Sequence, residues 1–169
     1  MQMESLTDVL ADQLADLYSA ERQLVVALPR VAQAAQSREL REAFENHLGE
    51  TRRHVSRLEQ IFEQADIPRM EEHCEGMEGL IKEGEEVIAA QGDPTARDAA
   101  LLAAAQRVEH YEIAGYGTAK TLADQLGLKE TRDVLDETLG EEGKADKLLT
   151  SIATGPMFQG GINQAAADR

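Results

Sequence analysis

The chain has no tryptophan, a single cysteine and an aromatic content of only 4%. So few aromatic residues disfavour a β-sandwich or barrel, since strands are enriched in aromatic and β-branched side chains. The one cysteine, Cys74, cannot form an intramolecular disulfide, so the fold needs no oxidising compartment. No stretch approaches roughly 18 uninterrupted apolar residues, and the first residues do not form a signal peptide. We therefore expect a cytoplasmic protein without a membrane segment.

Basic residues are also scarce. The 17 Lys and Arg residues stand against 32 Asp and Glu, which gives a formal net charge of −15 and a pI of about 4.6. A protein that binds phosphates needs a basic footprint, and this chain has no run of Lys and Arg. We expect neither nucleic acid nor an anionic membrane as a partner. An acidic chain of this kind attracts cations instead.

What the sequence does have is helical periodicity over most of its 169 residues. Four long helices are predicted, with a shorter one in the connection between the second and the third: residues 5–36, 37–66, 74–91, 94–126 and 129–153. Two tight hairpins joined by one long connection describe an all-α, ferritin-like four-helix bundle with one long crossover. Residues 1–154 would form this bundle. Residues 155–169 contain three glycines and no helical period, so we expect an arm or a disordered tail there.

Two glutamates interrupt apolar helical seams, one in each half of the chain. Glu21 follows Leu10, Leu14 and Leu17, and Glu112 stands in a seam of small and apolar residues between 101 and 126. An ionised carboxylate left alone in such a place costs several kcal/mol, so it must be protonated, paired or bound to a cation. Both glutamates are therefore candidate metal ligands.

An internal repeat relates the two halves. At an offset of 91 residues, which is the separation of Glu21 and Glu112, six identities occur: Glu39, Arg41, Leu48, Gly49, Glu50 and Leu58 match Glu130, Arg132, Leu139, Gly140, Glu141 and Leu149. Two similar helix hairpins about a pseudo-twofold axis would bring Glu21 and Glu112 to equivalent places. That geometry is what a dinuclear site requires.

Polar residues also mark the facing stripes of the other helices. His47, Glu50 and His54 lie three and four residues apart, so all three can face one point in the bundle. The helix over 94–126 adds Glu109, three residues before Glu112.

The last long helix offers two acids at positions where a seam expects apolar residues, Glu142 and Asp146. Glu141 competes with Glu142, because the repeat register favours Glu141 and the apolar seam favours Glu142. We favour Glu142, since that choice includes Asp146.

The predicted metal ligands are Glu21, His47, Glu50, His54, Glu109, Glu112, Glu142 and Asp146, with the choice between His47 and His54 open. Such oxygen-rich sites with one or two imidazoles suit iron or manganese better than structural zinc, which prefers thiolates and closed four-coordination. Two iron or manganese ions per chain, bridged by carboxylates, would neutralise the buried acids.

Five motifs resemble the YciE/YciF-type proteins of bacteria, a ferritin-like family linked to stress response: DLYSAERQ at 16–23, HLGET at 47–51, CEGMEGL at 74–80, QRVEHYEIAGYGT at 106–118 and TLGEE at 138–142. The resemblance implies a ferritin-like bundle, a homodimer and a dinuclear metal site. The wider ferritin and rubrerythrin pattern has Glu-x-x-His on the second helix. Here Arg53 stands three residues after Glu50, so the histidine must be His47 or His54, and Asp146 replaces a usual histidine.

Two functions of different classes follow. The first is a dinuclear metal protein, related to stress, that reacts with oxygen or peroxide. The second is a non-enzymatic helical-bundle dimer with a structural or vestigial metal site. Both are compatible with the sequence, which does not decide whether the chain is an enzyme.

Overall fold

Four long helices and two short ones make up the computed structural model, which describes residues 3–65, 67–70, 72–155 and 160–168. Within those residues the structure has helices and connections but no strand. The helices are α1 (Leu6–Ala34), α2 (Arg38–Gln64), α3 (Glu75–Ala89), α4 (Pro94–Gln125), α5 (Lys129–Thr154) and α6 (Ile162–Ala167). No helix in this part of the chain is long and apolar enough to cross a membrane.

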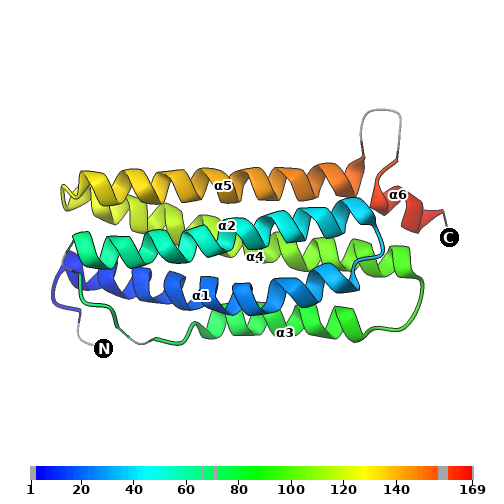
Figure 1. The fold of residues 1–169 in the computed structure, drawn as a ribbon, viewed down its shortest axis with the longest axis horizontal. Coiled ribbons are helices and arrows are strands. Elements are labelled where there is room, and N and C mark those ends of the chain that lie inside the picture. The colour runs from blue at the N-terminus through cyan, green and yellow to red at the C-terminus, as the bar shows by residue number, and fades with distance from the viewer. Residues whose placement is uncertain (1–2, 66, 71, 156–159, 169) are drawn as a thin grey trace.

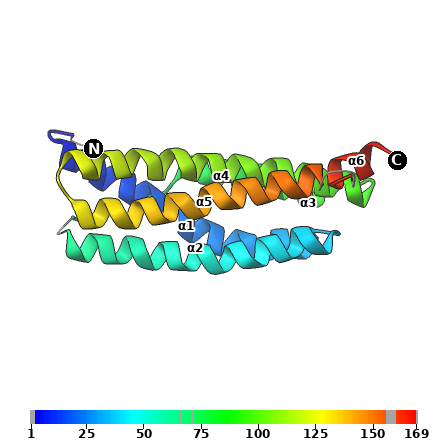
Figure 2. The same ribbon diagram turned by 90° about the horizontal axis from the view of Figure 1, so that it is seen from above.

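The four long helices form a bundle of two hairpins (Figures 1 and 2). Helix α1 packs against α2 and α4, and α5 packs against α2 and α4. The connection from α2 to α4 carries the chain back along the bundle, and α3 within it packs against α1 and α4 (Figure 1). The predicted all-α, four-helix fold with one long crossover and a short extra helix is confirmed.

The helix starts follow local capping chemistry. Ser5 caps α1 in a capping box with Asp8: its hydroxyl accepts from the Asp8 N–H, and the Asp8 carboxylate accepts from the Ser5 N–H. Ser37 caps α2, and Asp93 caps α4 with Pro94 at the first helical position. At the α4–α5 turn Gly127 has a φ of 74°, a left-handed conformation that favours glycine.

Apolar side chains fill the bundle in two separate clusters. One cluster includes Leu24, Leu28, Phe44, Leu101 and Leu149. The other includes Leu10, Leu14, Leu58, Ile61 and Leu135. Each long helix passes from one cluster to the other, and at the crossing each contributes buried acids or histidines. A polar layer therefore lies across the middle of the bundle.

The C-terminal segment, expected as an arm or a disordered tail, contains the short helix α6. This helix packs against α4 and α5 beside the end of the bundle (Figure 1). Residues 156–159 and 169 of the segment lie outside the described residues.

Candidate metal centre

The polar layer brings six of the eight predicted ligands together in the bundle core. Helix α1 contributes Glu21, α2 contributes His47 and His54, α4 contributes Glu109 and Glu112, and α5 contributes Glu142. All six are buried, and Glu21, His54, Glu112 and Glu142 are 0% exposed. Each side chain stands where an apolar residue would otherwise continue the core, because its helix spacing points it inward.

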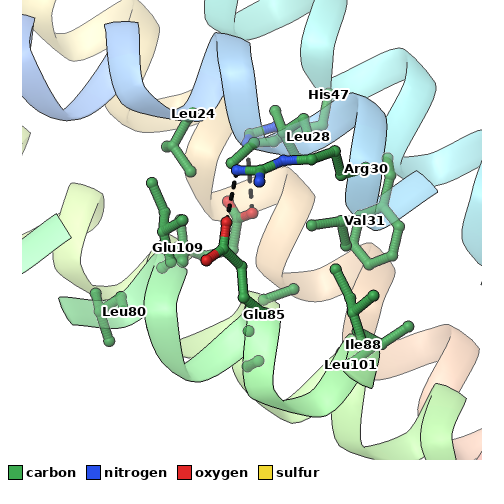
Figure 3. A pocket seen from close by; sticks show the side chains of 17 residues that line it. Leu24, Leu28, Arg30, Val31, His47, Leu80, Glu85, Ile88, Leu101 and Glu109 are labelled. Atoms are coloured by element: carbon green, nitrogen blue, oxygen red, sulfur yellow. Dashed lines mark ion pairs between the residues drawn. The ribbon is translucent and has the colours of Figure 1, made fainter. Parts of the chain in front are cut away.

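Four of these residues form one group. The ligand atoms of His47, Glu109, Glu112 and Glu142 all lie within 4.8 Å of one another. The Nε2 atom of His47 is 3.4 Å from Glu109 Oε1 and 3.9 Å from Glu142 Oε2. One imidazole and three carboxylates therefore surround a single point. Figure 3 shows two of the four residues, His47 and Glu109.

A second group shares one residue with the first. The ligand atoms of Glu21, His54 and Glu142 also lie within 4.8 Å of one another. The Nδ1 atom of His54 is 3.1 Å from Glu21 Oε1 and 2.9 Å from Glu142 Oε1. Because Glu142 offers one oxygen to each group, it is placed to bridge two cations.

The donor atoms of both groups lack ordinary partners. Nine buried atoms of these two groups have no hydrogen-bond partner among the described residues: Glu21 Oε2, both ring nitrogens of His47, Nδ1 of His54, Glu109 Oε2 and both carboxylate oxygens of Glu112 and of Glu142. Buried polar atoms are nearly always hydrogen-bonded, so a cluster of nine without partners needs an explanation. Two cations bound between them would satisfy all of these atoms except His47 Nδ1, which faces Glu50, and the residues therefore fit a dinuclear site.

Each histidine is backed by a glutamate on the side away from its carboxylate group. The Nε2–H of His54 donates to Glu141 Oε2 at 2.8 Å, and Arg57 holds the same carboxylate with its Nη1 at 2.5 Å. His47 Nδ1 lies 3.6 Å from Glu50 Oε2, an ion-pair distance. A carboxylate behind a histidine fixes its ring and leaves the other nitrogen free for a metal. In a metal-bound state, with Nε2 protonated toward Glu141, Nδ1 of His54 would offer its lone pair to the cation.

Burial and mutual repulsion raise the pKa of the core acids. Burial raises the pKa of Glu109 to about 8, and the neighbouring Glu142 and Glu21 add to the rise. Burial also raises the pKa of Glu112 well above 4.5, with repulsion from Glu142 and Glu21 second. The pKa of Glu21 is raised by burial although His54 opposes the shift. Without a cation Glu109 holds a proton near neutral pH, and burial favours the protonated form of Glu21 and Glu112 as well.

The pKa values of both core histidines are raised as well, which for an imidazole favours the charged form. Burial alone would lower the pKa of His47, but Glu50, Glu109 and Glu142 outweigh it and raise that pKa to about 9. Burial likewise opposes the change at His54, whose pKa Glu142 and Glu21 raise to about 10. The metal-free core is therefore a network of imidazolium ions and partly protonated acids. A cation that binds there must displace these protons.

Two predicted ligands lie outside both groups. Glu50 faces the Nδ1 side of His47 and is about one-third exposed. Asp146 accepts a hydrogen bond from Gln106 and pairs with the exposed His110, at a side-chain exposure of 23%. Asp146 lies one turn beyond Glu142 on the same face of α5, but its side chain is more exposed than that of Glu142.

Sequence reasoning left His47 and His54 as alternatives, but the structure brings both to the core. The sequence reasoning also did not include Arg57, which holds the Glu141 carboxylate. The signal for Arg57 was its position three residues after His54 on the same helix face. Tyr116, 1% exposed, donates a hydrogen bond from its hydroxyl to Glu21 Oε1 at 2.6 Å. It supports the oxygen of Glu21 that faces His54.

A third group of possible ligands lies on the surface. His73, Glu75 and Glu78 are all exposed at the start of α3, and His73 Nε2 is 3.0 Å from Glu78 Oε2. Exposed acidic groups of this kind are common in proteins without a metal, and these atoms can be solvated by water. We regard this group as ordinary surface.

Comparisons with known proteins give relatives for nearly the whole chain. Protein YciF of Escherichia coli strain K12 is 45% identical over 168 residues, which cover 98% of this chain and 100% of that protein. A crystal structure of the E. coli stress protein YciF matches with a TM-score of 0.87 and 46% identity, over 89% of this chain and 96% of that one. A solved structure of YcfI from Rhodopseudomonas palustris matches with a TM-score of 0.86 and 38% identity, over 90% and 97%.

These relatives have the same helical bundle as this chain. The resemblance predicted from the five motifs is confirmed by the match to YciF. The family described as a domain of unknown function, DUF892, matches residues 5–167. This chain belongs to the DUF892 family.

Proposed function

We propose that the chain is a ferritin-like metal protein that binds two iron or manganese ions between α1, α2, α4 and α5. The observation that carries the proposal is the set of nine buried donor atoms without hydrogen-bond partners among the described residues. Burying several carboxylates side by side is costly unless cations or protons neutralise them. The donors come from four helices, so the burial of these acids and histidines is a feature of the whole bundle and not of one helix.

The donor set favours particular metals. One position would be held by His47, Glu109, Glu112 and Glu142, and the other by Glu21, His54 and Glu142. Carboxylate oxygens with one imidazole per ion suit iron or manganese, whereas structural zinc prefers thiolates. The single cysteine, Cys74, belongs to an apolar cluster and is in neither group.

Bound iron or manganese would supply a redox couple and Lewis acidity for a reaction with oxygen or peroxide. All six ligands are buried, which limits the contact between the site and bulk water. Glu50 and Glu141 hold the histidine rings from behind, and Tyr116 holds one oxygen of Glu21. We place this activity in a bacterial stress response, since the relative YciF is described as a stress protein.

A non-enzymatic role is the second candidate. The metal-free cluster can neutralise itself, since the raised pKa values of both histidines leave them cationic beside the acids. The relative YcfI has been described as a candidate structural protein. In this alternative the chain forms a homodimer, and its metal site is structural or vestigial.

Metal analysis separates the proposal from a metal-free bundle. The protein, purified without chelator, is reconstituted anaerobically with iron(II) or manganese(II), desalted and measured by elemental analysis. We expect about two ions per chain, because Glu142 links two ligand groups. A content of less than about half an ion per chain would contradict the dinuclear site. Peroxide and oxygen turnover by the loaded protein then separates a reactive centre from a structural one.

A further inference from the structure

An apolar pocket ends at two of the metal-site residues. It lies between α1, α3 and α4, and His47 and Glu109 are its buried polar end (Figure 3). Its wall is aliphatic, with side chains that include Leu24, Leu28, Val31, Leu80, Ile88 and Leu101. At its outer rim Arg30 Nη2 pairs with Glu85 Oε1 at 2.7 Å, and both side chains are about half exposed.

Small residues in its wall leave this pocket unfilled. Ala27 of α1, Gly84 of α3, and Ala104 and Ala105 of α4 all line the pocket. A Cβ built on Gly84 would meet nothing within 4 Å. Larger side chains at these positions would close the gap, as elsewhere in a core packed like an organic crystal.

The volume decides what can occupy the pocket. It is about 50 Å³. A single water needs roughly 10–15 Å³, and a cavity of about 150 Å³ lined by Leu, Ile and Phe stays dry and binds benzene or xenon. This pocket is therefore too small for a six-carbon ring and large enough for a diatomic gas. Its aliphatic wall gives water few of the two to four polar partners it needs.

We propose that this pocket holds dioxygen beside the metal ligands and that it is the route by which dioxygen reaches them. The proposal rests on the function proposed above, because it names the oxidant that the centre takes. Dioxygen is apolar and loses no hydrogen bonds on entering an aliphatic wall, whereas hydrogen peroxide would leave its hydroxyl groups unpaired there.

A polar pocket reaches the same two residues from another side. It lies between α2, α4 and α5, and its lining includes Asn46, Glu50, Arg53 and Lys144 as well as His47 and Glu109. Side chains of this kind can hydrogen-bond water, peroxide and hydrated ions. The two pockets therefore divide oxidants by polarity, with dioxygen on the aliphatic side and peroxide on the polar side.

The first experiment uses xenon on the metal-free protein. Crystals of the full chain are pressurised with xenon, and ¹²⁹Xe NMR is recorded in solution. One xenon site is expected among Leu24, Leu28 and Leu101. The variant Gly84→Leu should lose it, because Gly84 shares a helix face with Leu80, Ile81 and Ile88 and a leucine there fills the gap. Ala105→Leu fills the same space from α4.

Gly79→Leu is the matched control. Gly79 is on the same helix, is exposed, lies outside the pocket lining, and also has nothing within 4 Å of an added Cβ. Both glycine variants replace a helix-breaking residue by a helix former, so both should fold. Xenon should remain bound in Gly79→Leu.

The second experiment compares two oxidants on the iron(II)-loaded protein. Dioxygen oxidises two iron(II) ions to iron(III), takes two electrons and two protons, and leaves as hydrogen peroxide. Hydrogen peroxide oxidises two iron(II) ions, takes two protons and leaves as two water molecules. In stopped-flow traces Gly84→Leu should slow oxidation by dioxygen about tenfold and leave oxidation by peroxide unchanged. Gly79→Leu should change neither rate.

Several results would overturn the proposal. The first is that no xenon binds in this pocket. The second is that xenon still binds there in both Gly84→Leu and Ala105→Leu. The third is that Gly84→Leu slows iron oxidation by dioxygen and by peroxide to the same extent. Failure of the chain to take up iron while xenon still binds would instead overturn the metal centre that the pocket serves. The two proposals therefore fail in different experiments.

Discussion

Glu21 has contacts that make its role testable by a single-atom change. It is 0% exposed, accepts a hydrogen bond from Tyr116 and lies 3.1 Å from His54 Nδ1. Replacing one carboxylate oxygen with an amide removes its charge and keeps its shape. The oxygen that Tyr116 contacts can still accept a hydrogen bond in the amide.

Glu21→Gln should remove one of the two bound ions and leave the metal-free protein as stable as the parent or more so. The reason is that burial raises the pKa of Glu21 and so favours its uncharged form in the metal-free protein, which the neutral amide replaces, whereas the amide is a poorer ligand for a cation. The melting temperatures of Glu21→Gln and the parent, in chelator and with iron, together with the metal content of each protein, test this prediction. A Glu21→Gln protein that melts much lower in chelator would show that the carboxylate is needed for the fold itself.

Leu24→Ala is the control at a neighbouring buried position. Leu24 is 3% exposed and belongs to an apolar cluster. Its truncation should lower the free energy of unfolding by about 2–5 kcal/mol with and without metal, because it leaves a cavity.

Individual ligands differ in how far sequence alone predicts them. Glu21 and Glu112 stand out because each breaks an apolar seam, and the seam also indicates Glu142 over Glu141. Glu50 and Asp146 satisfy the same spacing rules but lie outside the buried groups. Spacing gives the helix face and not the depth, since depth depends on how far each neighbouring helix covers that face.

At the scale of the helix, α1 and α4 approach closely at a glycine. A Cβ built on Gly115 would lie 2.8 Å from Leu17 Cδ2, and Leu17 is 1% exposed. Gly117, two residues later on the same helix, has nothing within 4 Å of an added Cβ. The two glycines therefore look alike in sequence and differ in structure.

Gly115→Ala should destabilise the bundle by about 1–3 kcal/mol, because a buried leucine must move to admit the new methyl group. Gly117→Ala should stabilise it by up to about 1 kcal/mol through helix propensity alone. Chemical denaturation of both variants measures the difference. Equal changes of the same sign would contradict the close approach of α1 and α4 at Gly115.

Helices and their ends were predicted well because local rules determine them. Ser5, Ser37 and Asp93 with Pro94 mark starts that the structure has, and the glycine after α4 marks a turn. The short helix α6 was not predicted, since it has no apolar period of its own. Its contacts with α4 and α5 are tertiary and leave no local signal.

At the scale of the whole molecule, the polar layer links stability to pH. The pKa of His47 rises from 6.5 to about 9, and that of Glu109 rises from 4.5 to about 8. At a pH between the unfolded and folded pKa of each group, the folded metal-free chain binds more protons than the unfolded chain. This range is 6.5 to about 9 for His47 and 4.5 to about 8 for Glu109. Its free energy of unfolding therefore falls as pH rises through that range.

The metal-free protein should melt at a lower temperature at pH 9 than at pH 6.5. The histidine contribution is fully present below pH 6.5 and is lost as pH rises through about 9. Glu141 acts in the opposite sense only in acid, since Arg57 and His54 outweigh burial and lower its pKa to about 2. Calorimetry in chelator at several pH values tests this trend. A melting temperature that rises over the range would contradict it.

The central claim is that the bundle core holds two metal ions, and anomalous diffraction from crystals loaded with iron tests it most directly. A map at the iron absorption edge should have two peaks per chain, one among His47, Glu109, Glu112 and Glu142 and one among Glu21, His54 and Glu142. A core without peaks, or peaks only at the exposed His73, Glu75 and Glu78, would contradict the claim.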